Sequence, residues 1–443
     1  MRIKNIHIKN FRGFREESFS FDPSLMVIVG NNTAGKTTLL QAIQVALGAY
    51  LKSLKDLPNN KQYRCNFTAS DVYKSYNISK KQFFPADEPT CINVEADFFA
   101  TKEGTSEFEV VPISWWRELK GNITTHSNAC AGELIKQVHR MEKLHRSEKE
   151  EINAIYPLVL SFGVNRIDSQ YRAATKSEER GSHIERAYKS ALKESVDFKS
   201  AFDWIYRYDR NYKFGREFVG TKEAFLKALE MAIPALSELE VDTNNKELFA
   251  KVSVTGMEPS YHTFDTMSDG FKSLICIVAE IAYRCIQLNG YLGTESVLRT
   301  PGVVIIDELD LYLHPHWQRH VLHDLQQAFP MIQFIISSHS PFIVQSVKSK
   351  NVITLDGVKA ATDPQKRSLE EIAISEMNMK NIIRSSRYTE MLDKAEEYYH
   401  LVREGKDSEV YSVNLKQQLD TIEQEFSDDP AYVALLRAER MSK

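Results

Sequence analysis

The stretch that decides the fold of this chain is Gly30-Asn31-Asn32-Thr33-Ala34-Gly35-Lys36-Thr37. It consists of a glycine, four residues and then Gly-Lys-Thr, which is the pattern of a phosphate-binding loop. The apolar residues 26–29 before it predict a short buried strand, and apolar side chains recur at helical spacing after it. Because a strand, a glycine loop and a helix are the context that this motif requires, the stretch predicts a loop that holds phosphate groups.

The loop predicts a role for its polar groups. Its backbone N–H groups and the positive N-terminus of the helix are expected to surround the phosphates of a nucleotide. Lys36 would reach the β- and γ-phosphates, and the Thr37 hydroxyl would hold Mg²⁺. The alternative is a chance glycine turn that binds no ligand. The strand before the loop and the helix after it argue against this alternative. The expected ATP-binding residues of the loop are Gly30, Asn31, Asn32, Thr33, Ala34, Gly35, Lys36, Thr37 and Thr38.

A second apolar stretch ends in two acids and reads Val303-Val304-Ile305-Ile306-Asp307-Glu308. Such a β-branched run is typical of a fully buried parallel strand, and ligands bind at the carboxyl ends of these strands. We expect Asp307 to bind Mg²⁺ through water and Glu308 to polarise the attacking water. Taken alone, the stretch is also compatible with an ordinary strand that surface acids follow.

Two further stretches stand around these acids. One is Met267-Ser268-Asp269-Gly270-Phe271-Lys272-Ser273, which precedes an apolar helix. A Ser-x-Gly turn at a helix N-terminus suits a γ-phosphate, although on its own it is equally an N-cap and a turn. The other is Phe334-Ile335-Ile336-Ser337-Ser338-His339, which reads as a buried strand that ends in a histidine. Taken alone, His339 is more often a structural histidine.

In this order along the chain, the stretches resemble the motifs of ATP-binding-cassette ATPases. Residues 309–318, directly after Glu308, resemble the D-loop of the SMC-like members, which include the RecF and OLD types. The resemblance is greatest to the PtuA-type ATPase of the Septu anti-phage system, some of which travel with retrons. It covers roughly the first 45 residues and about residues 235 to 360.

The resemblance implies an α/β fold, namely an ABC-type P-loop ATPase head with a largely helical insertion and a C-terminal helical extension. It implies that the protein binds ATP and Mg²⁺ and hydrolyses ATP to ADP and phosphate. Thr37 and Asp307 would bind Mg²⁺, and Glu308 and His339 would be the catalytic residues. His339 would sense the γ-phosphate. Ser268 and Gly270 would contact ATP held by another copy in a head-to-tail dimer or higher oligomer. In the expected division, residues 1–50 and 236–362 form the two parts of the head. Residues 51–235 form the insertion, and residues 363–443 form the extension.

One part of the family pattern is missing. No clear glutamine stands where the family has its Q-loop, and residues 158–166 are the best candidate for that segment. Asn165 or Ser161 would then lie near the nucleotide. The last ligand of the metal is therefore not identified by the sequence.

The chain shows no HNH, PD-(D/E)xK or TOPRIM pattern of nuclease residues. By resemblance, it would control a separate, PtuB-like HNH endonuclease in anti-phage defence, with the helices after Lys366 as the docking surface. A retron's reverse transcriptase with its msDNA, and DNA, are further candidate partners. The alternatives are a RecF-like DNA-repair ATPase, and a regulatory scaffold that binds ATP and hydrolyses little of it.

Composition bounds the remaining choices. The 443 residues carry a net charge of −4 and are 42% hydrophobic, which supports a real core and no strong global attraction for nucleic acid. An odd count of five cysteines without metal-ligand spacing favours a reducing cytoplasm, and no apolar run approaches membrane-spanning length. Aromatic and basic side chains alternate in residues 204–213, a pattern that suits the binding of nucleic acid. The alternative, which we favour, is a helix whose rings pack on the head.

Overall fold

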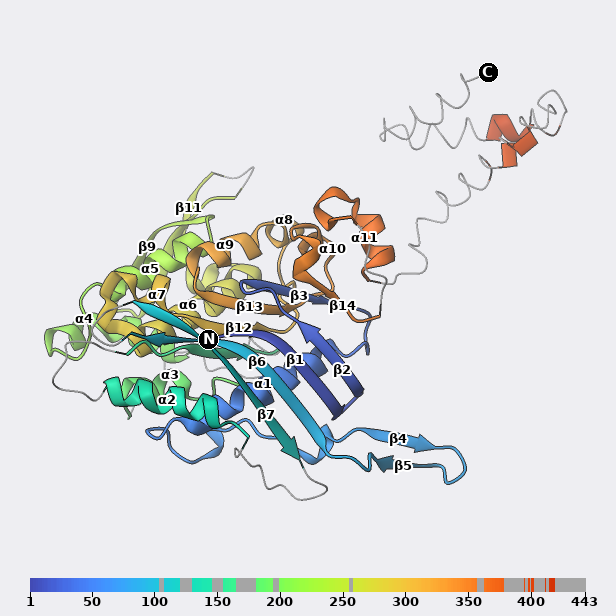
Figure 1. The fold of residues 1–443 in the computed structure, drawn as a ribbon. Coiled ribbons are helices and arrows are strands. Elements are labelled where there is room, and N and C mark those ends of the chain that lie inside the picture. Colours follow the sequence, from blue (N-terminus) through green and yellow to red (C-terminus); the bar gives the residue numbers. More distant parts are fainter. Residues whose placement is uncertain are drawn as a thin grey trace. The chain divides into compact units, whose positions relative to one another are not determined.

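The computed structural model describes residues 1–102, 107–119, 130–145, 154–164, 181–193, 199–254, 258–356 and 362–377, with helical residues at 394, 397–398, 400–401, 411 and 414–418. The chain forms two compact units, Met1–Asn378 and Met379–Lys443, and the elements below belong to the first (Figure 1). Asn165 and most of the region after Lys366 lie outside the described residues. The four-part division of the sequence stays a prediction.

A parallel sheet forms the centre of the first unit. Among the described residues it has five strands in the order β14-β3-β13-β12-β8. Every residue of β3, β8, β12 and β13 is buried, as expected for strands covered on both faces. The strands predicted before the glycine loop, the two acids and the histidine are thereby confirmed. The bounds are Leu25–Val29 for β3, Leu158–Phe162 for β8, Gly302–Ile306 for β12, Ile332–Ser337 for β13 and Val352–Thr354 for β14.

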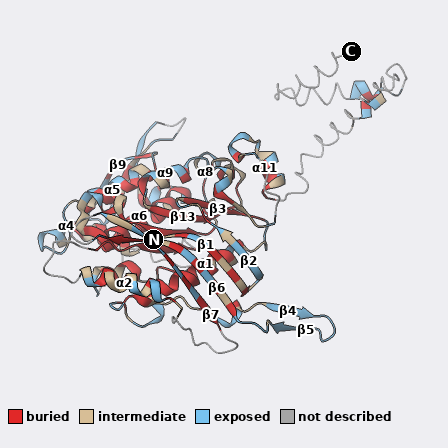
Figure 2. Cartoon of the chain, in the orientation of Figure 1, coloured by how far each residue is buried: buried red, intermediate tan, exposed pale blue. Residues whose placement is uncertain are grey.

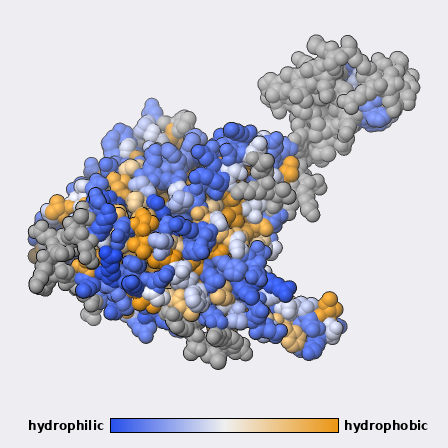
Figure 3. Space-filling model, viewed as in Figure 1, coloured by the Kyte–Doolittle hydropathy of each residue, from blue (hydrophilic) through white to orange (hydrophobic). Residues whose placement is uncertain are grey.

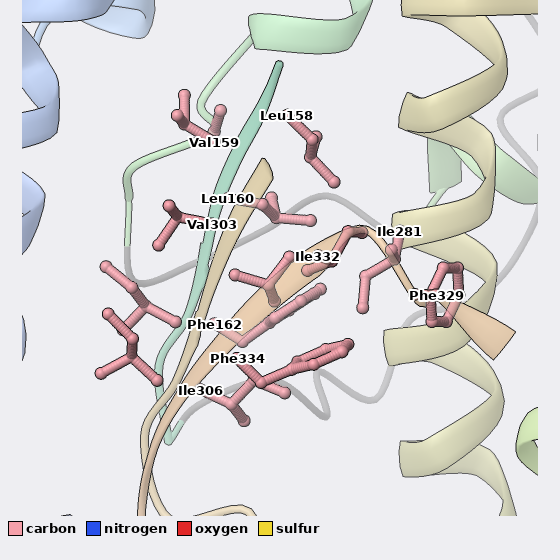
Figure 4. Close-up of a cluster of buried hydrophobic side chains, with 14 of the residues drawn as sticks. Leu158, Val159, Leu160, Phe162, Ile281, Val303, Ile306, Phe329, Ile332 and Phe334 are labelled. Atoms are coloured by element: carbon pink, nitrogen blue, oxygen red, sulfur yellow. The ribbon is translucent and has the colours of Figure 1, made fainter. Parts of the chain in front are cut away.

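Helices cover both faces of this sheet, as Figure 1 shows. Helix α6 (Asp269–Asn289) lies on one side with α5 (Thr221–Ala232) and α9 (Val321–Ala328), and α1 (Lys36–Ser53) lies on the other. In Figure 4, Leu160 and Phe334 point toward Ile281 of α6, whereas Val159 and Val303 point away from it. Alternate side chains of each strand therefore pack against different helices, and red strands fill the centre of Figure 2.

A second, antiparallel sheet has the order β2-β1-β6-β7 and packs against α1. Its strands are Arg2–Phe11 for β1, Phe14–Ser20 for β2, Thr90–Thr101 for β6 and Phe108–Leu119 for β7. Trp115 of β7 is buried and donates its indole N–H to the Ala46 carbonyl of α1 at 3.0 Å. The sequence between 51 and 235 thus supplies β6 and β7 to this sheet and β8 to the central one.

The remaining elements surround these layers. Residues 181–232 are largely helical where they are described, as expected. In α4 (Lys199–Lys213), Trp204 and Tyr208 are buried and the Trp204 ring lies against Phe225 and Tyr283, so the alternative in which these rings pack on the head is confirmed. These elements are β4 (Lys74–Asn77), β5 (Gln82–Pro85), α2 (Gly132–His145), α3 (His183–Tyr188), α4 (Lys199–Lys213), β9 (Leu236–Asp242), β10 (Glu247–Val252), β11 (Ser260–Thr263), α7 (Ser296–Arg299), α8 (Pro315–Gln318), α10 (Pro341–Gln345) and α11 (Leu369–Ser375).

The apolar surface of the described residues includes one exposed hairpin. The hairpin β4–β5 exposes Tyr76, Ile78 and Phe83. Its tip, at the lower right of Figure 3, carries hydrophobic surface. In the described part of the chain, no helix has both the length and the apolar character needed to cross a membrane.

Candidate nucleotide site

The loop between β3 and α1 needs glycine at both glycine positions of its motif. Gly30 has φ 154° and Gly35 has φ 104°, in the region that side chains with a Cβ rarely adopt. A Cβ on Gly35 would lie 2.9 Å from the Phe14 ring, and one on Gly30 would lie 2.8 Å from a carboxylate oxygen of Asp356. No side chain caps α1 at Gly35, so the first N–H groups of the helix have no partner within it. The loop therefore presents backbone donors where an anion would bind.

Lys36 bends back over this loop. Its side chain is almost fully buried, and Nζ donates to the Gly30 carbonyl at 2.8 Å and to the Asn31 carbonyl at 3.1 Å. Burial lowers the pKa of Lys36, and the nearby Glu308 and Asp307 carboxylates oppose that shift. The ammonium group is thus held at the loop, within the field of the acids that follow β12.

Thr37 and Asp307 are brought together although 270 residues separate them in the chain. The Thr37 hydroxyl donates to Oδ2 of Asp307 at 3.0 Å, and the Ser337 hydroxyl donates to Oδ1 of the same carboxylate. The Asp307 N–H donates to the Phe162 carbonyl at the end of β8, at 2.9 Å. A hydroxyl and a carboxylate side by side form a set of hard oxygen ligands, which fits Mg²⁺.

Glu308 leaves the strand in a strained conformation. Its φ is 49°, which is uncommon for a residue with a side chain and costs on the order of 1–3 kcal/mol. Its N–H donates to the Ser337 hydroxyl at 2.8 Å, and the next N–H, of Leu309, donates to the Ser337 carbonyl at 3.1 Å. Ser337 therefore holds the turn at Glu308 through both its hydroxyl and its carbonyl oxygen.

His339 lies at the same edge, because β13 runs between β3 and β12. Its N–H donates to Asp310 Oδ1 at 3.3 Å, and the imidazole is half-buried. The loop, the two acids and the histidine thus follow three neighbouring parallel strands. This is the edge at which ligands of open α/β sheets bind.

The Ser268–Gly270 turn is in contact with residues 309–318. Ser268 is the N-cap of α6, is exposed and makes no capping hydrogen bond with its side chain. A Cβ on Gly270 would lie 2.7 Å from the Tyr312 carbonyl oxygen, and the rings of Phe271 and Trp317 are 4.1 Å apart. Among the described contacts, none joins the Ser268 side chain to the glycine loop of its own chain.

Two polar residues of the site were not predicted. Asp356 accepts from the Asn31 N–H with both carboxylate oxygens, at 3.2 and 3.0 Å. Ser337 organises the two acids, and its place at the end of a buried strand was the available signal. No local pattern pointed to Asp356.

The Q-loop prediction needs a correction at Ser161. This side chain is fully buried in β8, and its hydroxyl accepts from Nε2 of Gln44 in α1 at 2.7 Å. It therefore links the sheet to α1 and does not face a ligand. Strand β8, the described start of this segment, ends at Phe162 beside Asp307, and Asn165 lies outside the described residues.

Comparisons with known proteins agree with this geometry. A family model described as an AAA domain matches residues 5–246, which is more than half of the chain, and a second AAA-domain model matches residues 259–345. The chain is 25% identical to the "Retron Vc95 probable ATPase" of Vibrio cholerae serotype O1 biovar El Tor, over 92% of this chain and 84% of that one.

Two further relatives point the same way. The "Retron Ec83 probable ATPase" of Escherichia coli is 23% identical over 99% of this chain and 86% of its own. The "Septu protein PtuA" of Bacillus thuringiensis is 34% identical over 25% of this chain and 27% of its own. The chain therefore belongs to the AAA-domain family, as an SMC-like, ABC-type ATPase related to the ATPases of retron and Septu defence systems.

Proposed function

We propose that this protein binds and hydrolyses ATP with Mg²⁺, dimerises on ATP, and thereby regulates a separate HNH endonuclease in anti-phage defence. The observation that carries the proposal is the meeting of Thr37 and Asp307, with Lys36, Glu308 and His339 at the same edge of the sheet. These are the residues that the phosphate-binding loop and the acids of a P-loop ATPase supply.

The chemistry follows from where each side chain lies. The donors at the start of α1 and the Lys36 ammonium would hold the β- and γ-phosphates. Thr37 and Asp307 would hold Mg²⁺, which neutralises charge that develops on the phosphate oxygens. The described residues contain no protein-only cluster of three metal-binding side chains, so the other ligands would be phosphate and water oxygens. Glu308 would take the proton of the attacking water, and His339 would contact the γ-phosphate.

The exposed signature turn supports a site shared between two copies. Ser268 is at the N-terminus of α6 with a hydroxyl that caps nothing in its own chain. Helix α6 has 21 residues, and the N-terminus of a helix attracts an anion. The turn therefore suits the γ-phosphate of ATP held by a second copy. The contact of Gly270 with Tyr312 would transmit closure to residues 309–318.

The proposed output rests on the relatives. The retron ATPases align with nearly the whole chain, and the Septu protein PtuA aligns with a quarter of it. A PtuB-like nuclease is therefore the partner that we propose, with a retron's reverse transcriptase and its msDNA, or DNA, as further ones.

The test is to purify the full-length protein from its native operon and to challenge cells that carry the operon with phage. Co-purification of an HNH nuclease, together with protection that Lys36→Ala abolishes, would support the proposal. Lys227→Ala, an exposed position on α5, is the matched control and should protect as wild type does. ATP hydrolysis without a nuclease partner and without protection would instead favour a RecF-like repair ATPase. Protection without measurable hydrolysis would favour the ATP-binding scaffold.

A further inference from the structure

A cavity of about 550 Å³ lies between α3, α4 and the loop that joins α4 to α5. Its wall reaches α6 near Gln287, whose Oε1 is 3.0 Å from Nδ1 of His183. Gln287 follows Asp269 by 18 residues, which is about 27 Å along a helix. The cavity therefore stands at the opposite end of α6 from the signature turn.

Arginines dominate the described wall of this cavity. They are Arg186 of α3, Arg207 and Arg210 of α4, and Arg216 of the following loop. The acids in the wall are Asp203 and Glu217. Four guanidinium groups against two carboxylates leave an excess of positive charge, in a chain whose net charge is −4. A concave surface with one sign of charge concentrates ligands of the opposite sign.

Both acids already have partners. Asp203 forms an ion pair with Arg207 at 4.0 Å, and Glu217 accepts from the Trp204 indole N–H at 3.0 Å. Burial raises the pKa of Glu217, and the Trp204 indole N–H and the nearby Arg186 oppose that shift. Arg186, in contrast, has a buried Nε with no hydrogen-bond partner among the described residues. A buried donor without an acceptor is costly, and a bound anion would supply one.

The cavity also offers surfaces for a flat, less polar group. Phe218 and Trp204 both line it; Phe218 is exposed, whereas the Trp204 ring is buried against Phe225 and Tyr283. Arginines beside aromatic rings are the combination that binds the phosphates and stacks the bases or sugars of nucleotides. Its volume also falls within the range of about 300–1,000 Å³ for small-molecule sites.

We propose that this cavity is a second anion site that binds a phosphate-bearing ligand, with the phosphate on the arginines and the remainder of the ligand against the exposed Phe218 ring. The phosphate could come from a free nucleotide or from a nucleic-acid strand, which share this chemistry. The site does not depend on ATP hydrolysis at the phosphate loop.

The experiment uses the full-length chain with Lys36→Ala, so that the phosphate loop contributes little to binding. Three probes are titrated: inorganic phosphate, AMP, and a short single-stranded DNA with or without a 5′-phosphate. The cavity variant is R210A/R216A, and the control is R15A/K227A, which removes the same charge from exposed positions outside the cavity. All four side chains are exposed, so both variants should fold, which thermal unfolding checks.

At least one probe should bind, and R210A/R216A should weaken it by about tenfold or more relative to the control, since charge-assisted hydrogen bonds are lost. The affinity should also fall as salt rises. Binding of AMP without DNA would assign a free nucleotide, and binding of DNA would assign a strand, at its end if the 5′-phosphate is required. The proposal is overturned if no probe binds, or if the cavity and control variants weaken binding equally. Because the loop is already disabled, this result is independent of whether the protein hydrolyses ATP.

Discussion

Single side chains at the end of the central sheet connect parts of the chain that are far apart. Ser337 is the clearest case, because its hydroxyl donates to the Asp307 carboxylate and accepts a hydrogen bond from the Glu308 N–H. Lys36 is held equally closely, by two carbonyl oxygens of the loop. Each of these side chains has one chemical task, which a single substitution can test.

Lys36→Ala should abolish tight ATP binding. The variant removes the cation that would contact the β- and γ-phosphates, while the backbone donors of the loop remain. Calorimetric titration of the purified variant with ATP and Mg²⁺ measures the effect, and Lys227→Ala serves as control. If both variants bind ATP as tightly as wild type, the phosphate site is elsewhere.

Glu308→Gln should retain ATP binding and slow hydrolysis by roughly 10²–10⁴-fold, the range for loss of a general base. Glutamine keeps the size of the side chain, so the strained turn at φ 49° should survive. Phosphate release under single-turnover conditions measures the rate. Equal rates in the variant and in wild type would reject the proposed role of Glu308.

Ser337→Ala should lower kcat by about tenfold with little change in the KM for ATP, since the lost hydrogen bonds orient Asp307 and Glu308 and do not contact the substrate. The matched control is Ser346→Ala, whose hydroxyl donates to Ile343 within α10. Steady-state kinetics of both variants decide the matter. A change in KM alone would mean that Ser337 acts on binding and not on the acids.

At the scale of elements, α6 connects the signature turn to the rest of the head. It is buried along nearly its whole length and packs on α3, α4 and α5. Inside it, Nε of Arg284 donates to Glu280 at 2.7 Å, and the same guanidinium donates to the Ala187 carbonyl and to the Lys189 carbonyl at the end of α3. This buried group fixes how α6 and α3 meet.

Arg284→Met should therefore destabilise the fold by about 3–5 kcal/mol, because it leaves the Glu280 carboxylate buried without its cation. The double variant R284M/E280M should recover part of that loss, since no buried charge remains. Denaturant unfolding of the single and double variants measures both effects, with the exposed Lys227→Met expected within about 0.5 kcal/mol of wild type. A single variant as stable as the control would show that the pair does not hold α6.

At the scale of the whole molecule, the proposed active site requires two copies of the chain. The glycine loop and the acids belong to one sheet edge, and among the described residues no hydrogen bond joins the exposed Ser268 side chain to them. ATP would then act as the ligand that joins two heads. The populations of open and closed assemblies would follow the nucleotide.

Ser268→Arg should block hydrolysis but leave ATP binding intact, since a bulky cation would obstruct the shared site. Mixed with Lys36→Ala protein, it should regain part of the activity, because one of the two sites in a mixed dimer has an intact loop and an intact turn. ATPase assays over a range of mixing ratios, with light scattering to show that mixed dimers form, provide the test. No recovery at any ratio would contradict a site shared between chains.

The sequence by itself determined the local parts of this protein. The glycine loop, the strand before Asp307, the strand before His339 and the Ser268 turn are each encoded by neighbouring residues, because backbone preferences and hydrophobic periodicity act over a few positions. The alternating rings of residues 204–213 likewise favoured packing on the head, where Trp204 and Tyr208 are buried.

Only the tertiary structure decided how these parts meet. The strand order places β13 between β3 and β12, and this pairing sets Thr37 against Asp307 across 270 residues. It also placed Asp356 on the loop and enclosed Ser161 against Gln44. Contacts of this kind depend on the register and packing of distant strands and helices, and no short sequence pattern records them.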